Sequence, residues 1–127
     1  MEPVYRYYPW KSLLKSGTEG IATSAYGRKL MYDMMMTYDG NQKRYVKIAG
    51  HGFKILAEAM EADLPYKINC PAQLICGEED HAGSRYNKAW HKNTGIPLAW
   101  IKDAGHNSNT DAPEEVNSLI VKLINKI

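Results

Sequence analysis

The sequence predicts an α/β protein in which a helical segment precedes a strand–helix–strand–helix unit with two parallel strands. Two short apolar runs, residues 71–76 and 97–101, have the length and bounding turns of buried strands. About twenty residues between them favour one helix, and a helical connection makes the two strands parallel with a right-handed crossover. Amphipathic helical patterns occupy most of residues 1–66. The chain is long enough for one domain with a modest core.

Three helices are predicted over residues 1–66. The first covers residues 1–16, and a loop marked by Gly17 and Gly20 follows it. Its aromatic side chains are predicted to form core, and the alternative is that they line a pocket for an apolar substrate. These side chains are Tyr5, Tyr7, Tyr8 and Trp10.

The second helix is expected to begin at Thr23 or Ser24, because either hydroxyl can cap a first turn, and to end near residue 38. The third helix, residues 42–62, has the clearest amphipathic pattern. Two glycines inside it either permit close packing or mark a break. Its apolar stripe consists of Tyr45, Ala49, Phe53, Leu56 and Met60, widened by Ile48, Ile55 and Ala59, and the glycines are Gly50 and Gly52. Leu64-Pro65 is expected to close this region.

Residues 67–127 contain the two predicted strands. The first strand, residues 72–76, is followed by a helix that Ser84 can cap and that ends before Gly95. The second strand leads to a last helix that is expected to start at Asp111, since Asp111-Ala-Pro-Glu114 resembles a capping box. Five apolar residues of this last helix are expected to be buried against the sheet: Val116, Leu119, Ile120, Leu123 and Ile127.

Each predicted strand ends in a turn that carries an ionisable side chain, Asp80 after the first and His106 after the second. Because neighbouring parallel strands end at the same edge of a sheet, the two residues are expected on adjacent loops, where open α/β sheets bind ligands. A carboxylate that holds one ring nitrogen of a histidine leaves the other free to take a proton from a nucleophile. On spacing alone, the favoured alternative is that Asp80 caps the next helix and His106 is an ordinary loop histidine.

The order of these motifs resembles the end of an α/β-hydrolase. Gly77-Glu-Glu-Asp80 is similar to the loop that carries the catalytic acid in that family, and Ala104-Gly-His106-Asn is similar to the loop that carries its histidine. The run from Ala104 to Asn117 is similar to members in which the histidine loop leads into the final helix. The resemblance covers about residues 66–127. It implies that Asp80 is the catalytic acid and His106 the catalytic base.

The same resemblance implies that residues 1–66 form a helical cap-like region. It also implies that residues 67–127 form the C-terminal βαβα portion of the hydrolase core. Within the cap-like region, Tyr8-Pro-Trp-Lys-Ser-Leu-Leu is similar to caps of bacterial lysophospholipase-like members. The likeness of cap sequences carries less weight than the two loop motifs, because caps diverge.

The nucleophile elbow of that family, Gly-x-Ser-x-Gly, does not occur in the sequence. In the family the nucleophile precedes the acid, whereas the residues before Asp80 are predicted to be helical. The chain is therefore interpreted as a C-terminal fragment of a hydrolase of carboxylic esters with an acyl or other apolar substrate. It would supply the acid and histidine of a Ser-Asp-His triad and would be inactive alone. The alternative is a non-catalytic binding module that retains the half-fold.

Composition and short motifs limit the partners, the location and the cofactors that the sequence predicts. The net charge of +2 is not concentrated in a basic stripe, so nucleic acid is not an expected partner. No apolar run approaches the roughly 20 residues of a membrane span, and the N-terminus lacks the regions of a signal peptide, so a cytoplasmic location is expected. Metal-ligand spacings such as HExxH or CxxC are absent. We expect no metal or cofactor, and the alternative is a metal site to which Asp80, His81 and His91 contribute. A small-molecule ester is the expected partner of the intact enzyme.

Two further expectations concern the cysteines and association. Cys70 and Cys76 flank the first strand and are roughly 20 Å apart in extended chain, which is too far for a disulfide. Cys76 is predicted to be a buried structural thiol. A sheet of two parallel strands leaves an unpaired edge, which is a template for another chain. The isolated chain is therefore expected to be a homo-oligomer, with helices folded over that edge as the alternative.

Overall fold

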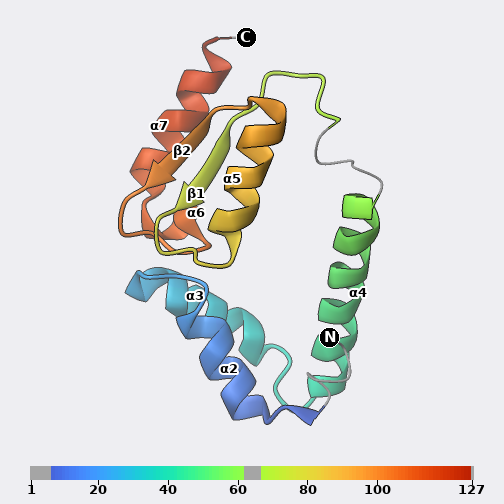
Figure 1. The fold of residues 1–127 in the computed structure, drawn as a ribbon. Helices are drawn as coiled ribbons and strands as arrows, with labels where there is room; N and C mark the ends of the chain where they lie inside the picture. Colours follow the sequence, from blue (N-terminus) through green and yellow to red (C-terminus); the bar gives the residue numbers. More distant parts are fainter. Residues whose placement is uncertain (1–6, 62–66, 127) are drawn as a thin grey trace.

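The computed structural model describes residues 7–61 and 67–126 (Figure 1). Helices contain 61% of these residues, and the two strands have four residues each. The predicted α/β class is therefore wrong, because the described part of the chain is mostly helical. A sheet this small is not a typical portion of an α/β-hydrolase. The strand–helix–strand order is present, but the strands are short and the helices dominate the structure.

Helix α2 spans Trp10–Glu19 and begins after Pro9, whose fixed φ suits the start of a helix. The predicted loop at Gly17 is wrong, because the helix continues through this residue and ends at Gly20. A Cβ on Gly17 would lie 2.8 Å from Met35 Sδ, so the glycine allows α2 to approach the next helix closely. The part of the first predicted helix that falls on residues 1–6 lies outside the described residues.

Helix α3 spans Ala25–Met36. Of the two predicted caps, Ser24 is the one used, and its hydroxyl accepts a hydrogen bond from the Gly27 N–H at 2.9 Å. Met35 is fully buried between the helices. The helix ends two residues before the predicted limit, and a turn through Gly40, at a φ of 73°, leads to the next helix.

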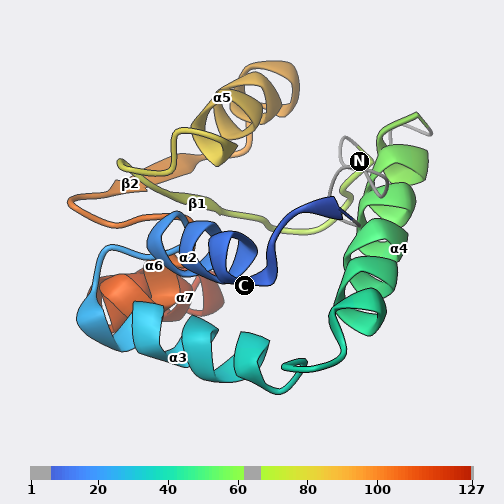
Figure 2. The same cartoon turned by 90° about the horizontal axis from the view of Figure 1, so that it is seen from below.

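Helix α4 spans Gln42–Glu61 without a break and stands at the side of the molecule in both views (Figures 1 and 2). Its first turns are covered: Tyr45 packs edge to face on Trp10, with ring centres 5.6 Å apart, and Val46 is buried. Farther along, Phe53 and Leu56 of the apolar stripe are 40% and 57% exposed. The side chain of Met60 and the boundary at Leu64-Pro65 lie outside the described residues.

Strand β1 (Leu74–Gly77) pairs in parallel with β2 (Leu98–Ile101), in a register that places Leu74 beside Leu98. Helix α5 (Gly83–Thr94) lies on one side of the two strands, and α6 (Ser108–Asp111) and α7 (Pro113–Ile124) lie on the other (Figure 2). The core of this unit forms around Ile101, Ala104 and Val116, with Ile75, Ala112 and Leu119 packed against them.

Three local predictions in this unit need correction. Strand β1 begins at Leu74, two residues later than predicted. Helix α5 receives no side-chain cap from Ser84, although Gly95 ends it in the left-handed conformation as expected. The last helix does not start at Asp111 but is divided into α6 and α7 at Ala112, because the residue before a proline is disfavoured in helical geometry.

The apolar face of α7 is only partly covered. Val116 is buried, but Ile120 is 44% exposed, so its predicted burial against the sheet is not observed. Ile127 lies outside the described residues. Among the helices of the described ranges, none is long and apolar enough to cross a membrane.

The helical segment contacts the β-unit through the loop between α2 and α3. The N–H of Asn107 donates to the carbonyl of Ile21 at 2.8 Å, and the Thr23 hydroxyl donates to the carbonyl of Asp103 at 2.7 Å. These bonds join residues about 80 positions apart in the chain. The predicted domain boundary at residue 66 falls at the edge of a stretch that the structure does not describe.

Candidate acid–base site

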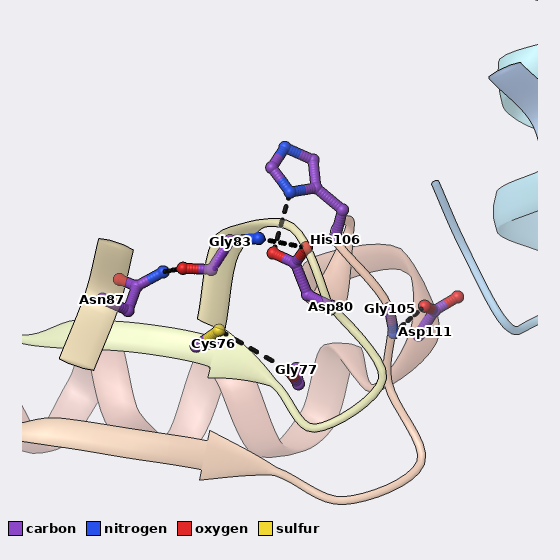
Figure 3. A network of polar contacts seen from close by, with 8 residues as sticks. All are labelled: Cys76, Gly77, Asp80, Gly83, Asn87, Gly105, His106 and Asp111. Carbon is purple, nitrogen blue, oxygen red and sulfur yellow. Dashed lines mark hydrogen bonds and ion pairs between the residues drawn. The ribbon is translucent and has the colours of Figure 1, made fainter. Parts of the chain in front are cut away.

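Asp80 and His106 meet where β1 and β2 end (Figure 3). Asp80 lies three residues after the end of β1, and His106 lies five residues after the end of β2. The Nδ1 atom of His106 is 2.9 Å from Oδ2 of Asp80. The expectation that two separate loops bring these residues together is confirmed, and the parallel pairing of the strands is the reason.

The carboxylate of Asp80 also caps α5. Its Oδ1 atom accepts a hydrogen bond from the Gly83 N–H at 2.7 Å, and so satisfies one of the N–H groups that a helix start leaves without a partner. The positive end of the helix dipole favours a negative charge at this place. Asp80 thus caps the helix with one carboxylate oxygen and contacts His106 with the other. Its role as catalytic acid stays a prediction.

The two side chains differ strongly in exposure. Only 8% of the Asp80 side chain is accessible to solvent, against 56% of the His106 side chain. Because a carboxylate only accepts hydrogen bonds, we place the proton of the 2.9 Å contact on Nδ1. Nε2 is then the basic nitrogen, and it points away from Asp80 on the outer side of the ring (Figure 3).

Two glycines allow the loops to come this close. A Cβ on Gly83 would collide with the carboxylate of Asp80, and a Cβ on Gly77 would collide with the carbonyl oxygens of Ala104 and Gly105. Because Gly77 has no side chain, the backbone of the loop that carries His106 can pass directly against the backbone at the end of β1. Steric exclusion of a side chain thus explains why a glycine stands at the start of the Gly77–Asp80 motif.

Asp111 holds the histidine loop, which carries His106 (residues 102–107), from the side away from Asp80, and its Gly105 contact is drawn in Figure 3. Local sequence patterns do not identify this role. The Asp111 carboxylate accepts hydrogen bonds from the N–H groups of Gly105 at 2.8 Å, Thr23 at 2.9 Å and Ser24 at 2.9 Å. Burial alone would raise the pKa of this carboxyl, but the hydrogen bonds outweigh burial and lower the pKa from 3.8 to about 2. Nothing in local spacing indicates this contact, because two of the donors lie 87 and 88 residues away.

Cys76 lies on β1 close to this site and is 3% exposed, which confirms the prediction of a buried thiol. Burial raises the pKa of this thiol, and the Asp80 carboxylate raises it further, while Asn87 and Lys88 act in the opposite direction. A thiol of raised pKa carries little thiolate at neutral pH and is a poor nucleophile. Its burial and its raised pKa therefore make Cys76 a poor candidate for the nucleophile that His106 would activate.

In the part of the chain that the structure describes, no group of three or more His, Cys, Asp or Glu side chains is arranged to hold a metal ion. What the site offers is one buried carboxylate, one oriented imidazole and an exposed basic nitrogen. That combination can hold a histidine ready to accept a proton from a group placed above it.

Comparisons with protein-family models, with curated proteins and with solved structures found no significant match to this chain.

Proposed function

We propose that Asp80 and His106 are the acid and the base of a Ser-His-Asp hydrolytic site that cleaves carboxylic esters, as the sequence resemblance to hydrolases implies. The observation that carries this proposal is the 2.9 Å contact between Asp80 Oδ2 and His106 Nδ1. It leaves Nε2 of an exposed ring free for a nucleophile. The serine would come from residues outside these 127, since the Gly-x-Ser-x-Gly motif is absent here.

In this proposal the chemistry of each residue follows from its position. Nε2 of His106 takes the proton of the serine hydroxyl while the oxygen attacks the ester carbonyl, and then gives this proton to the departing alcohol. Asp80 holds the ring in the Nδ1–H tautomer and offsets the positive charge that forms on it. The buried position of Asp80 makes this interaction stronger than it would be in water.

The isolated chain is expected to be inactive. The nucleophile and the oxyanion hole provide most of the rate acceleration in such sites, and an Asp–His pair alone lacks both. The proposed substrate is a small ester with an acyl or other apolar part, and the proposed location is the cytoplasm. Nucleic acid is not part of this proposal.

The test uses the protein as it occurs in its source cells. An antibody raised against this chain captures the native protein, which is then treated with a fluorophosphonate probe that labels activated serines. We expect label on a captured polypeptide, and loss of the label when the cells carry His106→Ala. The control is His81→Ala, an exposed histidine in the neighbouring loop, which should leave labelling unchanged. Absence of label on every captured polypeptide would refute the catalytic role.

The DNA upstream of Met1 provides an independent check. A continuous reading frame that encodes Gly-x-Ser-x-Gly would agree with the proposal. A frame that begins at Met1 would require the serine to come from a second polypeptide, and co-capture of that labelled polypeptide would then be expected.

The second candidate function is a non-catalytic binding module. The exposure of apolar side chains on α7 favours it, since Val121 is 53% and Ile124 61% exposed. Failure of the probe to label any captured species, together with recovery of one partner protein in a fixed ratio, would support this function over hydrolysis.

A further inference from the structure

Helix α4 carries an apolar row, most of which the rest of the described chain leaves exposed. The row consists of Ile48, Gly52, Ile55 and Ala59, which follow one another at intervals of four, three and four residues. This spacing places them along one seam, as in helices that pair with another helix. Ile48 is 50% and Ile55 57% exposed. A Cβ on Gly52 would meet nothing within 4 Å, so the middle of the row is open.

The charges of α4 are reversed relative to its own dipole. Lys43 and Arg44 lie in its first turn, where the dipole favours acidic groups. Glu58, which also pairs with Lys54 of the same helix at 3.6 Å, lies near its end, where basic groups are favoured. The first turn holds no acidic residue and the last turn no basic one. Such charges are unfavourable in an isolated helix. A second helix that runs antiparallel to α4 would make these charges favourable, because its acidic C-terminal end would lie beside the basic N-terminal end of α4.

We propose that α4 forms the interface of a two-fold dimer, in which it lies antiparallel to α4 of a second copy and crosses it at Gly52. A two-fold axis between residues 51 and 52 brings Ile48 opposite the partner's Ile55 and Arg44 opposite the partner's Ala59, beside the partner's Glu58. Gly52, at the crossing, lets the two backbones approach closely. The second copy is the occupant that fits, because the basic start and the acidic end of α4 are complementary to those of its own reversed image.

This interface differs from pairing along the open edge of β1 and from packing on the exposed face of α7. It is independent of the hydrolytic site, because the row on α4 shares no residue with the loops of Asp80 and His106. The experiments below therefore leave the proposed hydrolytic function untouched, whichever result they give.

Sedimentation equilibrium of the full chain at micromolar concentration measures association. We expect a mass of twice the 14.4 kDa of one chain. Ile55→Lys should weaken the dimer at least tenfold, because it places a charge in the seam. The matched control is Ile124→Lys on α7, a residue of similar exposure at 61%, which should leave the dimer intact. Both residues are exposed, so both variants should fold, which circular dichroism verifies.

Cysteine cross-linking determines the direction of the helices. In a Cys70→Ser background, chains with Ile48→Cys and chains with Ile55→Cys are prepared separately and mixed under oxidising conditions. In an antiparallel pair, position 48 faces position 55 of the partner, so a disulfide forms only when the two variants are mixed. In a parallel pair, each position faces its own copy, so each variant alone also forms a disulfide. Each chain carries only one of the two introduced cysteines, so a disulfide between positions 48 and 55 can form only between chains.

A charge exchange gives a third measurement. Arg44→Glu and Glu58→Arg should each weaken the dimer about two- to fivefold, and the chain with both changes should recover the affinity. A monomeric wild-type chain would overturn the proposal. So would a dimer that survives Ile55→Lys or is lost with Ile124→Lys, a disulfide formed within either single variant, or a double charge variant that stays weak.

Discussion

Asp111→Asn should destabilise the chain at neutral pH, and the loss should fade as the pH falls. The wild-type carboxylate receives three backbone hydrogen bonds, from Gly105, Thr23 and Ser24. An asparagine keeps the shape of the side chain but removes the charge, and its NH₂ group cannot accept from an N–H. The variant therefore tests whether the charge of Asp111, beyond its shape, holds the histidine loop to the start of α3.

The magnitude follows from the pKa of this carboxyl, which folding lowers from 3.8 to about 2. One pKa unit corresponds to about 1.4 kcal/mol, and because the residue is only partly buried, screening by solvent reduces the effect to about 1–2 kcal/mol. The folded pKa lies below the unfolded one, so this stabilisation is fully present above about pH 5 and is lost as the pH falls towards 2.

The assay is urea denaturation of both chains at pH 7 and at several values down to pH 2.5, at one fixed protein concentration. The difference in the free energy of unfolding should be about 1–2 kcal/mol at pH 7 and should shrink steadily below pH 4. Asp39→Asn, an exposed carboxyl after α3, is the control and should show no such difference. A difference between wild type and Asp111→Asn that is independent of pH would refute the reasoning.

Three further predictions concern the site itself. Gly77→Ala should cost about 2–4 kcal/mol in urea denaturation, because its Cβ would collide with the backbone of the histidine loop; a neutral result would contradict that packing. Of the two free thiols, exposed Cys70 should react quickly with Ellman's reagent and buried Cys76 only after denaturation, so two fast thiols would count against the structure. In ¹⁵N spectra, the neutral ring of His106 should carry its proton on Nδ1, and Asp80→Ala should shift the neutral ring towards the Nε2–H tautomer; an unchanged tautomer would mean that Asp80 does not hold the ring.

The features that the sequence predicts well are those that short-range rules govern. Ser24 as the cap of α3 follows from the hydroxyl before an amphipathic run. The stop at Gly95 follows from the left-handed conformation that glycine adopts easily. The contact between Asp80 and His106 is long-range, yet it was predictable because parallel strands that are joined by a helix end at the same edge.

The fold class was not predictable in the same way. Two apolar runs and a resemblance to hydrolases favoured an α/β protein, but the strands reduce to four paired residues each. Helix-forming residues meanwhile extend α2 through Gly17, where a glycine is required for contact with Met35. Whether a glycine ends a helix or lets another element approach it depends on the tertiary neighbour, which local composition does not reveal.

Asp111 shows why the candidate site and the helical segment have to be considered together. Its carboxylate accepts the N–H groups of Thr23 and Ser24 at the start of α3, and also that of Gly105, the residue before His106. The positive end of α3 and the backbone of the histidine loop are therefore bound to the same negative charge. A shift of α3 would move this charge and, through Gly105, the loop that orients the imidazole. The helices that precede the sheet thus position the base from behind, while Asp80 positions it from the side.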